Sequence, residues 1–109
     1  MSKKRIVVIC PGRGSYTRET SNYLKEYGAP ASKSIQWMDD QRETQGLLSL
    51  TNLDRQNFKA RTHMVGENAS SLIYACSFSD FMSIDRNKYE ILSVVGNSFG
   101  WYTALVLSG

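Results

Sequence analysis

Histidine, cysteine and proline are scarce in this 109-residue sequence, and it contains no long hydrophobic run. The two cysteines, Cys10 and Cys76, are too few for a disulfide framework, so we expect both to be small buried apolar residues. A membrane-spanning helix needs about 20 apolar residues. The apolar run 6–10 is too short for this or for a secretory signal, and Arg13 follows it. The sequence therefore predicts a cytoplasmic protein with no membrane partner.

The single histidine, His63, limits the acid–base chemistry that the chain can supply. It lies in the polar segment 61–66, between two expected helices, and we expect it to be a solvated loop residue. The aspartates are scattered among lysine and arginine, which is typical of solvated helix faces. They include Asp39, Asp40, Asp54, Asp80 and Asp85. No metal site is predicted.

The overall composition is that of one small folded domain. Hydrophobic residues make up 41% of the chain and aromatic residues 11%, which excludes wholesale disorder. The net charge of +3 suits a partner with an acidic surface or phosphate groups. An ordinary mildly basic protein has the same charge, and this second interpretation is favoured. A nucleic-acid partner is not predicted.

The most informative segment is Gly96-Asn97-Ser98-Phe99-Gly100, a Gly-x-Ser-x-Gly motif. It lies between the β-favouring apolar run 90–95 and the helix-like segment 101–107. A strand that turns directly into a helix holds the residue at the corner in strained backbone angles and exposes its hydroxyl. The helix start also directs free N–H groups and a positive dipole end at an oxyanion. We therefore predict that Ser98 is a nucleophile; a tight turn with an inert serine is the alternative.

A second glycine motif follows the first apolar run. Residues 5–10 are predicted to form a buried strand, and Pro11-Gly12-Arg13-Gly14-Ser15 comes next. Two glycines separated by one residue let a loop bring backbone N–H groups close to a ligand, as an oxyanion hole or a phosphate-binding loop requires. The motif is neither a dinucleotide-binding motif nor a Walker loop. A simple glycine-rich turn is an equally good interpretation.

Together, the two motifs resemble those of the malonyl-CoA:acyl carrier protein transacylases and the acyltransferase domains of fatty acid and polyketide synthases. The family's first motif usually reads Phe-Pro-Gly-Gln-Gly-Ser-Gln, matched here by residues 10–16. Its second usually reads Gly-His-Ser-Leu-Gly-Glu-Tyr-Ser-Ala-Leu, matched by residues 96–105. Residues 68–75 stand where the family has a Gln-Pro-Ala-Leu helix start. The resemblance implies an α/β fold with a parallel-sheet, α/β-hydrolase-like acyltransferase core, of which residues 1–109 are the N-terminal part of a single domain.

The resemblance also implies roles for individual residues. Ser98 would take an acyl group, which the resemblance implies to be malonyl, from a coenzyme A thioester and pass it to the phosphopantetheine thiol of an acyl carrier protein. Coenzyme A thioester is then a substrate, and no cofactor is permanently bound. The backbone N–H groups of Arg13 and Phe99 would form the oxyanion hole. Asn68 and Asn97, which replace a glutamine and a histidine of the family, would contribute to the substrate site.

Two further expectations concern what surrounds the serine. Trp101 replaces the family's usual glutamate, so we expect a bulky indole to alter the shape of the pocket. The family's histidine base and its malonyl-binding arginine would lie beyond Gly109, in a C-terminal remainder of the domain that we expect as a partner. Without a base the hydroxyl stays protonated, so the 109-residue chain alone is expected to be nearly inert toward thioesters.

Helices are predicted between the two motifs. Two strands separated by helices imply parallel pairing, because the connection is far longer than a hairpin needs. Two strands also make a poor sheet, which is a second reason to expect further polypeptide in the native fold. The predicted helices cover residues 18–27, 32–45 and 67–82, with a short, ambiguous helix within 47–58.

Three classes of function follow from these features. The favoured one is the serine acyltransferase, in which the acyl group passes to a carrier thiol in preference to water. The second is a serine hydrolase, either an α/β-hydrolase or a patatin-like lipase, in which water takes the acyl group. The third is a non-catalytic carrier-binding relative, which would be consistent with Asn97 and Trp101 beside the serine.

Overall fold

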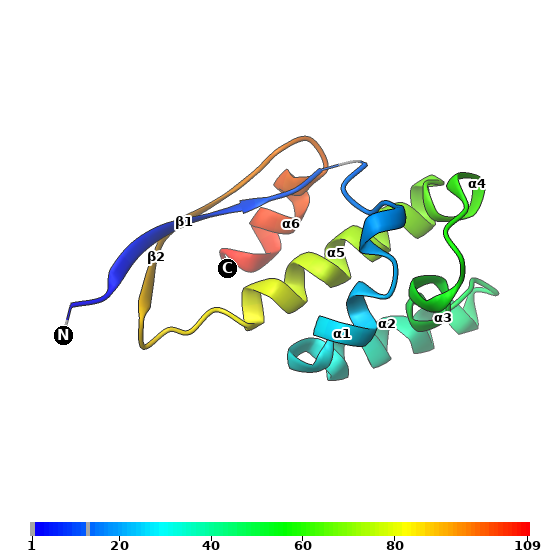
Figure 1. The fold of residues 1–109 in the computed structure, drawn as a ribbon, viewed down its shortest axis with the longest axis horizontal. Helices are drawn as coiled ribbons and strands as arrows, with labels where there is room; N and C mark the ends of the chain where they lie inside the picture. The colour runs from blue at the N-terminus through cyan, green and yellow to red at the C-terminus, as the bar shows by residue number, and fades with distance from the viewer. Residues whose placement is uncertain (1, 13) are drawn as a thin grey trace.

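The computed structural model describes residues 2–12 and 14–109, and within them two parallel strands and a set of helices (Figure 1). Strand β1 (Lys4–Cys10) pairs with β2 (Tyr89–Gly96) from Lys4 opposite Tyr89 to Cys10 opposite Gly96, with an irregularity between Ile6 and Val7. The parallel pairing predicted from the sequence is confirmed. Because the strands are parallel, the loops that follow them emerge at the same edge of the sheet.

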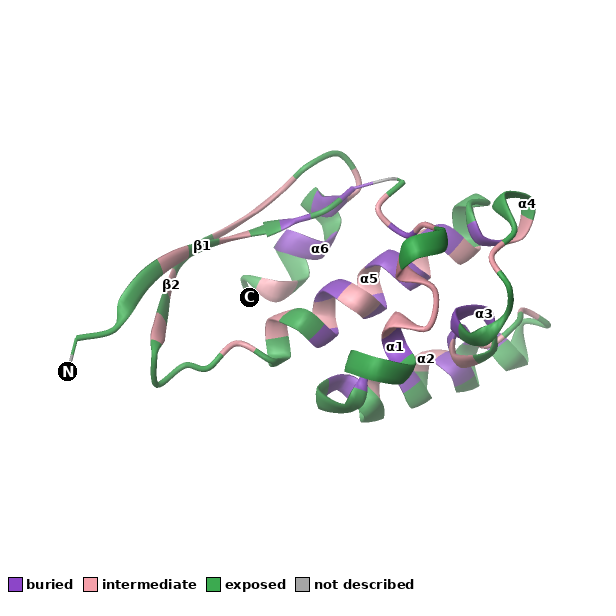
Figure 2. Cartoon of the chain, viewed as in Figure 1, coloured by how far each residue is buried: buried purple, intermediate pink, exposed green. Residues whose placement is uncertain are grey.

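One face of this sheet is covered and the other is open. Helix α6 (Gly100–Leu107) packs on both strands and on α5 (Gly66–Met82). Alternate residues of β1 therefore differ in burial: Cys10 is buried and Val8 is half-buried, whereas Val7 and Ile9 are exposed (Figure 2). The exposed side of β1 therefore carries the apolar Val7 and Ile9 as well as the charged Arg5, whereas a parallel sheet is usually covered on both faces.

Helix α5 lies at the centre of the helical part of the molecule. Around it are α1 (Tyr23–Tyr27), α2 (Ser32–Thr44), α3 (Leu50–Arg55) and α4 (Ala60–His63). Two short 3-10 turns, η1 (Arg18–Thr20) and η2 (Ala29–Ala31), precede α1 and α2. The buried hydrophobic side chains of this layer form one cluster that includes Leu24, Ile35, Leu50, Leu53, Leu72 and Ile73.

The prediction of one continuous helix over residues 18–27 is wrong, because the structure has a 3-10 turn and a separate short α-helix in this segment. Asn22 has a φ of 68°, in the left-handed region, and this residue separates η1 from α1. Its N–H donates to the Asp54 carbonyl at 2.8 Å, so a tertiary hydrogen bond replaces the helical one at this point. The end of α2 matches the prediction, since Gly46 follows it with a φ of 73°. The short helix α4 was not predicted.

Three polar residues predicted to be solvated are buried. His63 is 1% exposed and lies in α4, so the prediction of a solvated loop histidine is wrong. The carboxylate of Asp39 accepts hydrogen bonds from the Leu50 N–H and the Thr51 hydroxyl, each at 2.6 Å. The Asp54 carboxylate, 1% exposed, accepts from the Tyr16 hydroxyl at 2.8 Å and the Lys25 N–H at 3.0 Å. Each buried carboxylate thus satisfies its oxygens by tying one helix to another segment.

In the part of the chain that the structure describes, no helix has the length and apolar character needed to cross a bilayer. Cys10 and Cys76 are both free thiols; Cys10 is buried, as expected, whereas Cys76 is only half-buried.

Candidate functional site

Ser98 stands at the corner between β2 and α6 with its backbone in the left-handed region. Its φ is 55°, and only one other non-glycine residue among those described, Asn22, has a positive φ. A left-handed conformation costs a residue with a Cβ roughly 1–2 kcal/mol, so the surrounding structure has to hold it in place. The side chain of Ser98 is exposed. The strained, exposed corner predicted from the motif is therefore confirmed.

Three glycines make this corner possible by allowing backbones to approach closely. A Cβ on Gly96 would overlap the carbonyl group of Gly100, so the strand end and the helix start could not pass each other. A Cβ on Gly100 would overlap the Cys10 carbonyl oxygen, at the end of the neighbouring strand. A Cβ on Gly12 would overlap the Asn97 carbonyl oxygen and approach the Ser98 Cβ to 2.9 Å. The corner therefore depends on glycine at all three positions.

The loop after β1 is packed directly against the corner that carries Ser98. The Asn97 N–H donates to the Cys10 carbonyl at 3.1 Å, and this bond joins the ends of the two strands. Gly14 has a φ of 87°, which allows the loop to turn, and the Ser15 N–H donates back to the Gly12 carbonyl at 3.3 Å. Arg13, whose N–H is predicted to be an oxyanion-hole donor, lies outside the described residues. Its neighbour Gly12 lies against Ser98.

The second predicted oxyanion-hole donor is the N–H of Phe99, immediately after the serine. Phe99 is the residue before the first turn of α6, where N–H groups have no acceptor within the helix. No hydrogen bond from the Phe99 N–H to another described residue is found. A developing oxyanion at Ser98 would therefore meet a donor that is not already engaged in the described structure, at the positive end of the helix dipole.

A cavity of about 210 Å³ opens beside Ser98. One wall is formed by Ser98, Phe99 and Tyr102 at the start of α6. The other is a single face of α5, with residues at spacings of three and four: Gly66, Ala69, Ser70 and Ile73. These α5 residues were not predicted to belong to the site. The sequence signal for this wall is the set of small residues Gly66, Ala69 and Ser70, which lie at helical spacing in the helix that precedes the strand with the motif.

The predicted substrate residues take different positions. Asn68 does not line this cavity: its side-chain oxygen accepts from Arg42 Nη2 at 2.5 Å, and its Nδ2 donates to the Thr62 carbonyl at 2.9 Å. Asn97 is exposed and contributes its backbone carbonyl to the corner, where the Gly100 N–H donates to it at 2.9 Å. Trp101 is exposed and does not line the cavity, whereas Tyr102 does.

Arg42, the partner of Asn68, is a buried cation that holds the start of α5 to α2. It is 6% exposed, and desolvation by burial lowers the pKa of its guanidinium. Besides the Asn68 oxygen, it donates to the Leu48 carbonyl at 2.7 Å, the Glu67 carbonyl at 3.3 Å and the Ser71 hydroxyl at 3.2 Å. Neutral oxygens on two segments thus accept hydrogen bonds from the Arg42 guanidinium. These bonds fix the end of α5 that forms the cavity.

His63 is engaged elsewhere and cannot accept the Ser98 proton. The Lys59 N–H donates to His63 Nδ1 at 3.0 Å, so Nδ1 is the acceptor and the proton lies on Nε2. His63 Nε2 then donates to the Leu53 carbonyl at 2.7 Å. The ring also stacks on Phe58 and Tyr16, with centroid distances of 5.1 and 6.1 Å. Its role is to join α3 and α4.

No other described side chain is hydrogen-bonded to the Ser98 hydroxyl. The nearby thiol of Cys10 is buried at the end of β1, and burial raises its pKa. That thiol is therefore protonated at neutral pH and is a poor nucleophile. Ser98 therefore places an exposed hydroxyl at this edge of the sheet, and no described side chain is hydrogen-bonded to it as a base.

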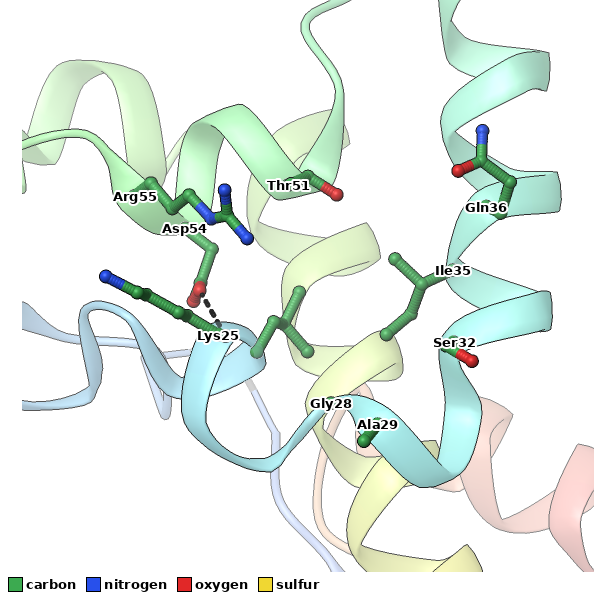
Figure 3. Close-up of a pocket in the computed structure, with 10 residues that line it drawn as sticks. Lys25, Gly28, Ala29, Ser32, Ile35, Gln36, Thr51, Asp54 and Arg55 are labelled. Atoms are coloured by element: carbon green, nitrogen blue, oxygen red, sulfur yellow. Dashed lines mark hydrogen bonds between the residues drawn. The ribbon is translucent and has the colours of Figure 1, made fainter.

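A second cavity, of about 310 Å³, lies away from Ser98 between α1, α2 and α3 (Figure 3). Leu24, Ile35, Thr51, Asp54 and Arg55 are among the residues that line it. Both oxygens of Asp54 are already engaged in holding α1 and the Tyr16 segment, as the dashed bond to Lys25 shows in part. This cavity is larger, and the exposed Lys25 and Ser32 are among its lining residues. None of its lining residues has a positive φ or stands at a strand–helix corner, so the geometry at Ser98 is the better candidate for chemistry.

Comparisons with models of protein families, with curated protein sequences and with solved structures find no match to this chain.

Proposed function

We propose that the protein is a serine acyltransferase that moves an acyl group from coenzyme A to the phosphopantetheine thiol of an acyl carrier protein, through an acyl-enzyme on Ser98. The observation that carries the proposal is the left-handed backbone of Ser98, held at the strand–helix corner by Gly12, Gly96 and Gly100. Holding a serine with an exposed side chain in such a conformation costs free energy, and an inert turn at this position would favour glycine.

The proposed reaction has two balanced steps. In the first, Ser98 Oγ bonds to the thioester carbonyl carbon while its proton passes to a general base, and the carbon–sulfur bond then breaks with the thiolate taking that proton. In the second, the carrier thiol attacks the ester in the same way and Ser98 regains its proton. The Phe99 N–H stabilises the oxyanion of each tetrahedral intermediate, together with the Arg13 N–H that the resemblance implies.

The proposal includes a further polypeptide segment that supplies the base as an imidazole. The outer face of the sheet and one side of α6 support it, because both expose large apolar side chains that a covering segment would bury. These side chains are Val7, Ile9, Leu92, Trp101, Leu105 and Val106. The complete acyltransferase, with the parallel-sheet core that the sequence resembles, would combine this chain and that segment in one α/β domain.

Partition of the acyl group between a thiol and water tests the proposal. The protein is incubated with malonyl-CoA or octanoyl-CoA, in the presence of imidazole as a soluble base, with or without pantetheine. We expect acyl-pantetheine to form faster than free acid in a reaction that Ser98→Ala abolishes. Release of free acid at the same rate with and without pantetheine would identify a hydrolase instead. No difference between the wild type and Ser98→Ala would refute both enzymatic functions.

A further inference from the structure

The cavity beside Ser98 has a shape and lining that define what the acyl group can be. Its α5 wall runs from Gly66 to Ile73, a stretch of eight residues that spans about 10 Å along the helix. Along this wall the residues change from the small, exposed Gly66 to Ile73, which is 3% exposed and belongs to the hydrophobic core cluster. The cavity is thus a groove between α5 and the start of α6, with Ser98 in its lining and a core residue at one end of its α5 wall.

We infer that this groove binds the alkyl chain of an uncharged, unbranched acyl group attached to Ser98, with the small Gly66 and Ser70 leaving room for the chain along the α5 wall. The inference rests on the proposed function for the covalent attachment, and on the groove for the class of acyl group. An uncharged acyl group of this kind differs from the malonyl group that the sequence resemblance implies. An extended chain of roughly six to eight carbons covers the length of the α5 wall.

The lining favours methylene groups over a carboxylate. Ala69 and Ile73 are buried members of the α5 wall, and Phe99 and Tyr102 face them with their rings 5.8 Å apart. Methylene groups placed between these apolar surfaces lose contact with water, which is favourable in proportion to the apolar area covered. A carboxylate in the same place would lose part of its hydration and gain no cationic partner, because no Lys, Arg or His is among the residues that line the cavity.

Gly66 gives direct control over the groove. A Cβ at Gly66 would meet no heavy atom within 4 Å, so the space above it is open, and Gly66 is the first residue of α5, where its backbone is helical. A larger side chain can therefore be introduced here without a clash with the backbone. Glu67, the next residue, is exposed and does not line the groove. It provides a matched position on the same turn.

The groove can be tested without acyl transfer by tethering alkyl chains at the position of the serine. In Ser98→Cys, the introduced thiolate attacks an alkyl methanethiosulfonate, the sulfur–sulfur bond to the alkylthio group forms, and methanesulfinate leaves. The native thiols of Cys10 and Cys76 are protected, since burial raises the pKa of both, that of Cys76 to about 12. Peptide mapping confirms the site of attachment for ethyl to dodecyl reagents.

We expect the melting temperature of the tethered protein to rise by roughly 2 °C for each methylene up to about six to eight carbons, and then to stop rising. Gly66→Leu and Ser70→Phe should remove this dependence on chain length, whereas Glu67→Leu should retain it. A melting temperature independent of chain length, or equal dependence in all four backgrounds, would overturn the inference.

Acylation by coenzyme A thioesters separates this inference from the proposed function. With imidazole present, octanoyl-CoA should acylate Ser98 at least tenfold faster than malonyl-CoA, and Gly66→Leu should reverse much of that preference. Faster acylation by malonyl-CoA would overturn the inference and leave the acyltransferase proposal intact. A melting temperature that depends on chain length, together with no acylation of Ser98 by either thioester, would have the opposite meaning. It would support the groove as an alkyl-binding site and refute the proposed acyltransferase function.

Discussion

Replacing Ser98 with glycine should stabilise the protein, because the left-handed backbone at this residue suits glycine better than serine. The φ of 55° costs a residue with a Cβ roughly 1–2 kcal/mol, whereas glycine loses about 0.5–1 kcal/mol more backbone entropy on folding than alanine does. The net gain for Ser98→Gly is therefore about 0.5–1 kcal/mol. This corresponds to a rise of roughly 2–8 °C in melting temperature for a domain of this size.

Ser98→Ala is the matched variant, since it removes the hydroxyl and keeps the Cβ. We expect its free energy of unfolding to lie within about 0.5 kcal/mol of the wild type. Asn22→Gly provides a second control at the other positive φ, of 68°, where the gain should be smaller because asparagine tolerates this region. Urea denaturation with a common slope would measure all three. A Ser98→Gly protein no more stable than Ser98→Ala would refute the claim that the fold holds the nucleophile under strain.

Three further predictions concern packing, buried charge and pH. Gly12→Ala should cost about 3 kcal/mol or more, because the new Cβ overlaps the Asn97 carbonyl oxygen, whereas Gly66→Ala should be neutral or stabilising; chemical denaturation would compare them. Arg42→Ala should lower the free energy of unfolding by about 3 kcal/mol, since it leaves buried oxygens without donors, and Arg42→Lys should recover only part of it. Burial, with two aspartates nearby, raises the pKa of the Cys76 thiol from 9.0 in a free thiol to about 12. The contribution of this thiol to the free energy of unfolding should therefore be fully present below about pH 9 and be lost as the pH rises toward 12. Urea titrations should show that Cys76→Ala reduces this decline by up to about 1.4 kcal/mol per pH unit.

The corner that carries Ser98 could be predicted from sequence because it depends on local backbone geometry. A short apolar run, two glycines around a serine and a segment without Gly or Pro together determine a strand, a tight turn and a helix. The structure places Ser98 at a positive φ and brings Gly96 and Gly100 into backbone contacts that exclude a Cβ. The approach of Gly12 to the same corner follows from parallel pairing, since both loops leave one edge of the sheet.

The buried polar residues could not be predicted, because their burial depends on partners far along the chain. Asp54 is satisfied by Tyr16 and by the Lys25 N–H, and His63 by carbonyl and N–H groups of the segments that it joins. Neither the composition nor the spacing of charges along the chain indicates such long-range contacts. For this reason the sequence pattern predicted that these residues are solvated. The same reason explains why Asn68, placed in the substrate site by resemblance, is used by Arg42 instead.

The identity of the residue that becomes acylated tests the central claim most directly. The wild type and Ser98→Ala would each be incubated with octanoyl-CoA and with malonyl-CoA, with and without imidazole, and then examined by denaturing intact-mass spectrometry and peptide mapping. We predict one acyl group for each wild-type chain, located on the peptide that contains Ser98, formed faster with imidazole and missing from Ser98→Ala. A wild-type chain that stays unmodified under all four conditions, or an equal adduct on Ser98→Ala, would contradict the assignment of Ser98 as a nucleophile.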